Sequence, residues 1–309
     1  MQILFITSNR LGDAVLSTGL VGALIERHPE ARLTVACGAL PAPLFAPIPN
    51  VDRVLPLVKR PWAGHWLDLW RFAVGRRWDL VVDLRASALA WTLRAGRRRV
   101  LDTRKSPAPV HRVHQLADLL ELNEPAAPRL WLDAASRARA AELVPEREVI
   151  CLAPTANWGG KRWPAERFAE LGQCLSATGG AVAVVGAVGE REMAAPVLDS
   201  IPHDRLIDLV GTEPLPVLAA CLARMSLYVG NDSGLMHLAA AAGAPTLGLF
   251  GPSRHEHYAP WREGCAYVRT PESYEQLVEV PGFDHRSQES LMTSLTVATV
   301  EQAARELLA

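Results

Sequence analysis

The chain has 309 residues, of which 49% are hydrophobic and 21% are charged, and its formal net charge is −1. This length exceeds the roughly 250–300 residues at which one hydrophobic core stops growing, so two domains are expected. The composition excludes a disordered chain, and no apolar run in the sequence reaches the roughly 18 residues that a transmembrane helix needs.

The cysteines and the first residues predict the compartment. The five cysteines are odd in number, widely spaced and without a C-x-x-C pair, which excludes a disulfide framework or a zinc site of the usual kind. The chain enters a short apolar strand directly after Met1, without a basic leader or a cleavage site. We therefore expect a cytoplasmic protein that can lie on the cytoplasmic face of the inner membrane.

The near-neutral net charge hides an asymmetry. Residues 1–150 carry 21 Lys and Arg against 15 Asp and Glu, and the excess is concentrated in residues 53–112, with 14 basic and 4 acidic side chains. This pattern predicts a face that attracts anions. Nucleic acid is not expected as a partner, because the basic residues are not interleaved with stacking aromatics and the pI is about 6.8. An anionic small molecule or an anionic membrane surface is favoured.

Short β-rich runs alternate with helical patterns along the chain. Alternation of this kind predicts βαβ units with parallel sheets, here two doubly wound Rossmann-like α/β domains that face a cleft. Ligands are then expected at the carboxyl ends of the strands. The predicted strands are 3–7, 33–36, 54–58, 80–84, 99–101, 149–153, 181–185, 206–209, 227–229 and 246–250.

The loops and the last helical pattern divide the chain into two domains and a C-terminal helix. A Pro-rich loop at 123–128 and a polar helix at 133–143 separate the halves, which places the domains at 1–147 and 148–294. Residues 295–309 carry apolar side chains at helical spacing, with Thr296 or Thr299 as the start signal. This segment is expected to form a closing amphipathic helix that can pack back on the first domain.

The first predicted strand leads into a glycine turn and a carboxylate, Gly12 and Asp13. Asp13 is either a helix N-cap or a functional carboxylate that accepts a proton from a hydroxyl group. The segment lacks G-x-G-x-x-G, and no acidic residue clearly follows about 20 positions later, so a Rossmann dehydrogenase is weakly supported.

The strand at 149–153 is followed by a loop that holds Thr155, two glycines and Lys161. These side chains could hold a diphosphate, although Arg162 after Lys161 departs from a P-loop and excludes ATP hydrolysis as the interpretation. The alternative is a solvated surface lysine. Only three of the 32 basic residues are lysines, namely Lys59, Lys105 and Lys161, which favours a specific role for Lys161.

The strand at 181–185 gives way to a glycine-containing turn that ends in Glu190. Either Glu190 or Glu192 could bond ribose hydroxyls, as acidic residues do in nucleotide sites. The alternative is that both are acids complementing the dipole of a following helix.

Residues 230–237, Gly-Asn-Asp-Ser-Gly-Leu-Met-His, connect a strand to a helix through a tight turn. The free N–H groups of a helix start attract a phosphate. Asp232 would repel that phosphate, so we expect it to bind something else, such as a sugar hydroxyl. The alternative is that Asp232 or Ser233 is only an N-cap.

No metal site is expected. The sequence contains no D-x-D and no H-x-x-H, so a carboxylate bridge between a metal and a nucleotide diphosphate is not encoded. Lys161 and helix N-termini must then balance the charge of a leaving group. The run His255-Glu256-His257 is too compact to predict a metal site and is interpreted as a surface loop.

Taken together, the Gly-Asp pair at the first junction, the Thr…Lys-x-Trp-Pro loop and the run 230–252 resemble glycosyltransferase family 9, the lipopolysaccharide heptosyltransferases. The resemblance implies the two-domain GT-B fold and an inverting, metal-independent transfer of heptose from ADP-heptose. The acceptor would be Kdo or a preceding heptose of the lipopolysaccharide inner core, which is a lipid-linked anionic saccharide.

The resemblance also implies roles for individual residues. Asp13 matches the general base, and Asp232 matches the residue that engages the donor sugar. The remaining donor contacts would be Thr155 and Lys161 at the diphosphate, Ser233, Gly234 and His237 around the phosphates, and Glu190 at the ribose. Arg10, Arg60 and Arg85 follow predicted strands, so their position in the topology makes them candidate acceptor-binding residues.

Some features depart from the family. Thr7 is neutral where some Kdo-acting members place a lysine, and residues 262–292 lack the paired cysteines that many members carry. A different nucleotide-sugar donor, or a non-catalytic saccharide-binding protein of the same fold, therefore remain alternatives. A nucleotide-sugar or NAD-dependent oxidoreductase or epimerase is disfavoured because G-x-G-x-x-G and Tyr-x-x-x-Lys are both absent.

Overall fold

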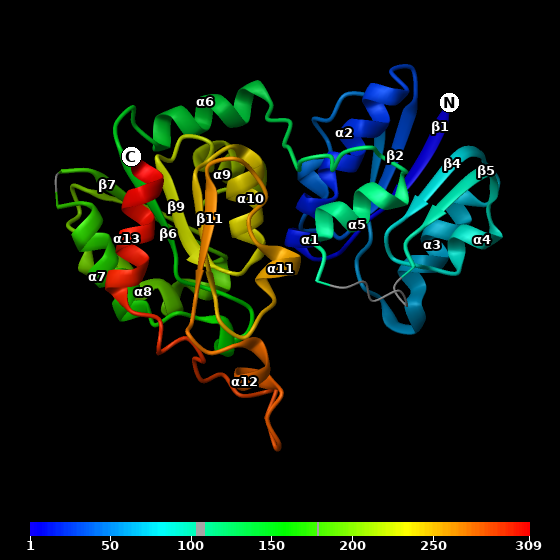
Figure 1. Ribbon diagram of the computed structural model, residues 1–309. Coiled ribbons are helices and arrows are strands. Elements are labelled where there is room, and N and C mark those ends of the chain that lie inside the picture. The colour runs from blue at the N-terminus through cyan, green and yellow to red at the C-terminus, as the bar shows by residue number, and fades with distance from the viewer. Residues whose placement is uncertain (103–108, 178) are drawn as a thin grey trace. The chain divides into compact units, whose positions relative to one another are not determined.

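The computed structural model describes residues 1–102, 109–177 and 179–309. The chain divides into two compact units, Met1–Asp133 (unit 1) and Ala134–Ala309 (unit 2). Each unit contains one parallel β-sheet with helices packed against it (Figure 1). Parallel strands are joined by crossover helices, which explains why the strand and helix patterns alternate in the sequence.

Unit 1 contains a five-stranded sheet in the order β3-β2-β1-β4-β5. The order reverses between β1 and β4, and such switch points are where ligands bind in open α/β sheets. Edge strand β5 is longer than predicted because its exposed arginines break the apolar pattern. The strands are β1 (Gln2–Ile6), β2 (Arg32–Cys37), β3 (Val51–Pro56), β4 (Arg77–Asp83) and β5 (Arg94–Val100).

The helices of unit 1 cover this sheet. Leu69 and Ala73 of α3 and Leu89 and Ala90 of α4 pack into one apolar cluster with side chains of β1, β2 and β4. Figure 1 shows α3 and α4 next to the sheet. The helices are α1 (Leu11–Leu16), α2 (Thr18–Arg27), α3 (Gly64–Ala73), α4 (Leu89–Thr92) and α5 (Arg112–Leu119), with 3₁₀ turns at Ala42–Leu44 and Pro61–Ala63.

Unit 2 contains a six-stranded sheet in the order β11-β10-β9-β6-β7-β8, which reverses between β6 and β9. β6 and β10 have the predicted bounds because every one of their residues is buried. Edge strand β11 was not predicted, since its residues are mostly half-buried and of mixed polarity. The strands are β6 (Val149–Ala153), β7 (Ala181–Gly186), β8 (Leu206–Val210), β9 (Leu227–Asn231), β10 (Thr246–Phe250) and β11 (Cys265–Arg269).

The helices of unit 2 include α6, which was expected to belong to the first domain. Helix α6 packs against α9, and Arg139 of α6 forms a 2.8 Å ion pair with Glu213, so unit 2 begins before α6 rather than after it. Helix α13 begins at the Thr296 cap as expected. The helices are α6 (Ala134–Leu143), α7 (Ala165–Leu175), α8 (Arg191–Ser200), α9 (Leu215–Leu222), α10 (Gly234–Ala242), α11 (His255–Tyr258), α12 (Tyr274–Val278) and α13 (Val297–Leu308), with 3₁₀ turns at Gly159–Lys161 and Val188–Glu190.

Helix α13 completes the core of unit 2. Val300 and Ala304 are fully buried in the cluster that contains Ile150, Trp163 and Phe168. The helix contacts α7 and strands β9, β10 and β11 of the same unit. Its apolar stripe is therefore satisfied within unit 2. Among the described residues, no helix combines the length and apolar character that crossing a bilayer requires.

Candidate functional site

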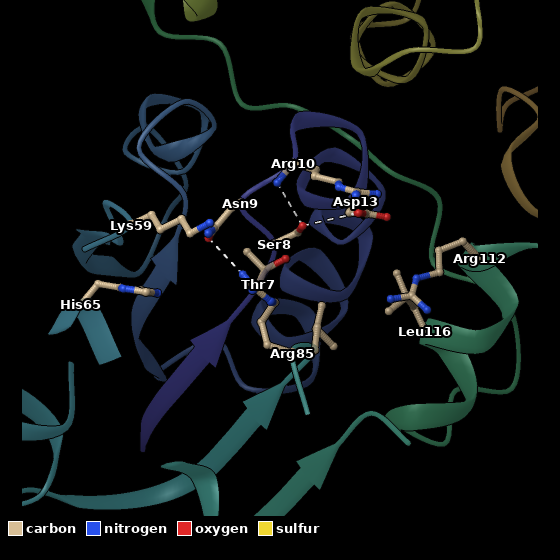
Figure 2. Close-up of a pocket in the computed structure, with 11 residues that line it drawn as sticks. Thr7, Ser8, Asn9, Arg10, Asp13, Lys59, His65, Arg85, Arg112 and Leu116 are labelled. Atoms are coloured by element: carbon tan, nitrogen blue, oxygen red, sulfur yellow. Dashed lines mark hydrogen bonds between the residues drawn. The ribbon is translucent and has the colours of Figure 1, made fainter. Parts of the chain in front are cut away.

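The carboxyl ends of β1 and β4 in unit 1 border a cavity of about 510 Å³, which we call the cationic cavity. Figure 2 shows Lys59 and His65 on one side of it and Arg112 on the other. The cavity therefore lies at the switch point of the sheet, where a ligand site is expected. It is lined by Thr7, Ser8, Asn9, Arg10, Asp13, Lys59, His65, Leu84, Arg85, Arg112 and Leu116.

Asp13 is the carboxylate of this cavity. Helix α1 begins at Leu11, and its N-cap residue is Arg10, so Asp13 lies within the first turn and is not the N-cap. The Ser8 hydroxyl donates a 3.4 Å hydrogen bond to Asp13 Oδ2 (Figure 2). The Asp13 side chain is only half-buried and lines the cavity. It is therefore placed where a bound hydroxyl group could reach it.

Four cationic side chains line the same cavity, namely Arg10, Lys59, Arg85 and Arg112. Arg85 Nη1 donates to Asn9 Oδ1 at 3.0 Å, and its guanidinium lies 5.6 Å from the centre of the Trp66 ring. Arg112 donates to the neutral Gln115 amide at 3.0 Å. Within the part of the chain that the structure describes, none of the four forms an ion pair with a carboxylate. The cavity thus carries uncompensated positive charge that an anion could neutralise.

The loop after β4 is built to present Arg85. Asp83, which is fully buried, accepts hydrogen bonds from the Arg85 N–H at 2.8 Å, the Ser87 N–H at 2.9 Å and the Ser87 hydroxyl at 2.5 Å. Burial raises the pKa of Asp83 although these hydrogen bonds oppose the shift. The fixed turn holds the Arg85 backbone at the rim of the cavity.

Arg10 and Arg85 thus line the cavity as expected, but Arg60 does not. Its guanidinium forms a 2.7 Å ion pair with Asp68 instead, while the neighbouring Lys59 lines the cavity. Lys59 and Arg112 were not among the predicted residues. The scarcity of lysine could have indicated Lys59, but no local motif marks Arg112, which the fold brings to the cavity from α5. Lys105 lies outside the described residues.

In unit 2 the corresponding switch point joins the loops after β6 and β9. Asn231, fully buried at the end of β9, donates to the Pro154 carbonyl at 2.9 Å and accepts from the Trp163 N–H at 3.0 Å. These bonds connect the two loops that hold the predicted donor residues. Asn231 belongs to the motif at 230–237, but the sequence pattern predicts no role for it.

Lys161 and Asp232 meet between these two loops. Lys161 Nζ lies 2.5 Å from Asp232 Oδ2, and the two side chains are 26% and 7% exposed. Lys161 is therefore not a solvated surface lysine, and Asp232 is not a helix cap. The structure brings together two residues that the sequence assigned separately to the diphosphate and to the sugar.

Helix α10 begins beside this pair. Ser233 occupies the N-cap position with extended backbone, but its side chain makes no capping hydrogen bond. The first N–H groups of the helix, from Gly234 onward, are thus not capped by Ser233 and are of the kind that binds anions. His237 lies buried in the next turn of the same helix. We call Thr155, Lys161, Glu190, Asp232, Ser233, Gly234 and His237 the Lys161 site.

Glu190 faces the loop after β6. Its Oε2 accepts hydrogen bonds from the Thr155 hydroxyl at 2.7 Å and from the Ala187 N–H at 2.8 Å. Glu192 is exposed, and in the described ranges it makes no comparable contact. The structure therefore favours Glu190 over Glu192 as the acidic residue of this site.

The residues His255 to His257 form part of helix α11 rather than a surface loop. The His255 ring lies 4.5 Å from the Tyr267 ring, and burial lowers the pKa of His255. Over residues 1–102, 109–177 and 179–309, no group of three or more His, Cys, Asp and Glu side chains is placed to hold a metal ion.

Comparison with known proteins gives the family. The sequence profile of glycosyltransferase family 9 (heptosyltransferase) matches residues 84–280. The lipopolysaccharide heptosyltransferase 2 of Salmonella typhimurium is 27% identical over 316 residues, and the match covers 90% of each chain. Asp13 lies outside the residues that the profile matches.

Solved structures agree on the fold. The Escherichia coli ADP-heptose lipopolysaccharide heptosyltransferase II superposes with a TM-score of 0.79 at 24% identity, covering 100% of this chain and 98% of its own. The E. coli heptosyltransferase WaaC with ADP-2-deoxy-2-fluoro heptose superposes with a TM-score of 0.71 at 18% identity, covering 99% of each chain. The two parallel-sheet units and the similarity to these structures confirm the GT-B fold class. The chain belongs to glycosyltransferase family 9, the heptosyltransferase family.

Proposed function

We propose that this glycosyltransferase transfers heptose from ADP-heptose to an anionic, lipid-linked saccharide of the lipopolysaccharide inner core. The named relatives are lipopolysaccharide heptosyltransferases, and one similar structure carries an ADP-heptose analogue. The observation that carries the proposal is the cationic cavity, where Asp13 is, among the described residues that line it, the one carboxylate beside four cationic side chains. Such a cavity suits an anionic saccharide whose hydroxyl group is to be deprotonated.

In the proposed reaction, the acceptor hydroxyl oxygen forms a bond to the anomeric carbon while the bond from that carbon to the diphosphate breaks. The attack comes from the opposite face, so the anomeric configuration inverts. Asp13 accepts the hydroxyl proton, and ADP leaves with the bonding electron pair. A general base of this kind contributes about 10²–10⁴-fold to the rate.

The Lys161 site would hold the donor. Lys161 and the start of α10 would stabilise the charge that develops on the leaving diphosphate, as oriented cations and helix N–H groups do. Thr155 would assist at the diphosphate, with Ser233, Gly234 and His237 around the phosphates. Glu190 would bond the ribose, and Asp232 the heptose hydroxyls.

Arg10 and Arg85 are the proposed acceptor contacts, and the geometry adds Lys59 and Arg112. Arg60 remains a proposed contact only if its ion pair with Asp68 opens. We propose that the reaction needs no metal ion and that it takes place at the cytoplasmic face of the inner membrane. Undiminished turnover in excess chelator would support metal independence, and loss restored by one added metal would contradict it.

The donor is tested by thermal shift with ADP, UDP, GDP and CMP, followed by assay of nucleotide release with and without acceptor. Stabilisation by ADP together with acceptor-dependent ADP release is the expected result. Stabilisation by another nucleotide would replace ADP-heptose with a different donor of the same family. Ligand binding without turnover on any inner-core acceptor would instead support a non-catalytic saccharide-binding protein.

A further inference from the structure

The segment between β3 and the middle of α3 exposes large apolar side chains. Trp62 is 100% exposed, and Val58, Leu67 and Trp70 are also exposed. Of the nine tryptophans in the chain, the three that are exposed in the described part are Trp62, Trp70 and Trp91. Tryptophan is a residue that folding normally buries, so its exposure at three positions of one unit calls for a binding partner.

The backbone at Trp62 turns this side chain outward. Trp62 and Ala63 both have left-handed backbone, with φ of 55° and 57°, which is uncommon for residues other than glycine. The Arg60 N–H donates a 3.3 Å hydrogen bond to His65 Nδ1 across this turn. Because the Trp62 side chain is fully exposed, it has no packing against the described residues that would offset the strain of this turn. Strain of this kind points to function.

The exposed side chains of α3 also lie on one face of the helix. Leu67, Trp70 and Arg71 lie at i, i+3 and i+4, so they share one face of the helix. The opposite face carries Leu69 and Ala73, which are buried in the cluster against the sheet. Helix α4 packs into that cluster as well, and its Trp91 is 67% exposed. The apolar side chains of Leu67 and Trp70 therefore lie on the face of α3 that points away from the buried cluster.

Positive charge accompanies the tryptophans. Lys59, Arg60 and Arg71 are exposed in the same segment, against the single carboxylate of Asp68. Asp68 forms the ion pairs with Arg60 at 2.7 Å and Arg71 at 3.9 Å. We call Val58, Lys59, Arg60, Trp62, Leu67, Trp70 and Arg71 the Trp62 surface. Tryptophan beside basic residues is the composition of proteins that lie in the interface of an anionic membrane.

The Trp62 surface adjoins the cationic cavity. Lys59 and His65 flank the Pro61–Ala63 turn in the sequence, and both line the cavity (Figure 2). Trp66, the next residue along, carries the Arg85 guanidinium over its ring. A bilayer that contacted Trp62 would therefore lie at the rim of the cavity that is proposed to receive a lipid-linked saccharide.

We infer that the Trp62 surface docks on an anionic lipid bilayer, with Trp62 and Trp70 entering the interface and Arg60 and Arg71 facing lipid phosphates. A bilayer is favoured over a second copy of the chain because the surface combines bulky tryptophans with a net positive charge, and two such surfaces would repel each other. The link between this surface and acceptor delivery rests on the proposed function, but the docking itself does not.

The test is co-sedimentation of the full chain with vesicles of phosphatidylcholine alone or mixed with phosphatidylglycerol. We expect binding to the anionic vesicles that weakens as sodium chloride is raised. Trp62→Ser with Trp70→Ser should lower the partition coefficient by at least about tenfold, and Arg71→Glu by about fivefold or more, because one basic residue at the surface contributes about that factor. Val188→Ser, an exposed apolar residue of unit 2, is the matched control and should bind like the unaltered chain.

Two further measurements separate the possible outcomes. Quenching of tryptophan fluorescence by brominated lipids should fall in the Trp62→Ser variant, which replaces a fully exposed side chain and so keeps the fold. Equal vesicle binding with and without the two tryptophans would overturn the inference. Light scattering that showed a Trp62-dependent dimer without vesicle binding would overturn it in favour of a second copy of the chain.

Catalysis distinguishes failure of this inference from failure of the proposed function. On a water-soluble acceptor without lipid, Trp62→Ser should keep its turnover, whereas Asp13→Asn should lose turnover but still bind vesicles. Loss of vesicle binding in Asp13→Asn, with its fold intact, would show that the binding arises from the cavity rather than from the Trp62 surface.

Discussion

Four cationic side chains of the cavity in unit 1 lack a carboxylate partner among the described residues, whereas Lys161 in unit 2 lies 2.5 Å from Asp232. Both features lie at the switch point of a parallel sheet. An anion can bind the cations of the cavity in unit 1 without breaking an ion pair. An anion that reaches Lys161 must instead share the ammonium group with the Asp232 carboxylate or displace that carboxylate. The two sites should therefore respond differently to salt and to substitution.

The difference also fits the two proposed substrates. A saccharide with several carboxylates and phosphates gains from many uncompensated cations, because each contributes attraction over the whole cavity. A nucleotide diphosphate is a compact charge that needs a fixed partner, and the partly buried ammonium of Lys161 is held in position before the donor arrives. Preorganisation of this kind lowers the cost of orienting the cation during reaction.

The largest expected effect is the loss of the Asp13 carboxylate. Asp13→Asn keeps the size of the side chain but cannot accept the hydroxyl proton, so turnover should fall by about 10²–10⁴-fold. The measurement is acceptor-dependent ADP release, together with ADP affinity, which should stay the same. Asp118→Asn is the matched control, because Asp118 is exposed on α5 of the same unit and does not line the cavity. Near-normal turnover in Asp13→Asn would remove the assigned role.

The position of Asp13 beside the carboxyl end of β1 could be predicted from the sequence, because it follows a strand that is buried except for Gln2 and comes directly after a glycine. The positions of Lys161 and Asp232 in the loops after β6 and β9 could be predicted for the same reason. Their pairing could not be predicted, because it depends on the order of strands in the sheet and on Asn231, which connects the two loops. Arg112 and the exposure of Trp62 likewise depend on packing between distant segments.

The strands show the same division. β6 and β10 carry only buried residues and were predicted with their observed bounds. The edge strands β5 and β11 expose polar residues, so the apolar signal was short at β5 and missing at β11. Sequence pattern therefore located the central strands and the residues directly after them. It did not locate side chains that reach a site from a helix or an edge.

The second effect concerns Lys161. Lys161→Ala removes a charge-assisted interaction with the diphosphate, which is worth about 1.5–3 kcal/mol and corresponds to about a 10- to 150-fold loss of ADP affinity. Asp232 would also lose its partner while remaining largely buried, so the free energy of unfolding should fall. Calorimetry and thermal unfolding measure the two quantities.

A double variant separates these contributions. Adding Asp232→Asn to Lys161→Ala should restore part of the lost stability, because it removes the unpaired carboxylate, without restoring ADP affinity. If ADP affinity returned as well, electrostatic repulsion by Asp232, rather than loss of a direct phosphate contact, would explain the single variant. Unchanged ADP affinity in Lys161→Ala would remove Lys161 from the diphosphate site.

The third effect concerns the cationic side chains of the cavity that lack a carboxylate partner. Arg85→Gln and Arg112→Gln should each raise the KM for the acceptor by about tenfold, the value of one charge-assisted hydrogen bond, and should leave the KM for the donor unchanged. Both should also weaken the dependence of the acceptor KM on sodium chloride. Arg97→Gln is the control, since Arg97 is exposed on β5 and does not line the cavity. Equal effects in all three variants would indicate general electrostatics instead of specific contacts.

The smallest effect concerns Glu190. Comparing ADP with inorganic pyrophosphate as ligands separates a ribose contact from a diphosphate contact. Glu190 already accepts bonds from Thr155 and the Ala187 N–H, so it is held in position to accept another from a ribose hydroxyl. Glu190→Gln should weaken ADP binding by about threefold to tenfold, the contribution of one hydrogen bond, but should not change binding of inorganic pyrophosphate. Lys161→Ala should weaken both ligands, and Glu192→Gln neither. A loss of pyrophosphate affinity in Glu190→Gln would mean that Glu190 acts through Thr155 on the diphosphate and not on the ribose.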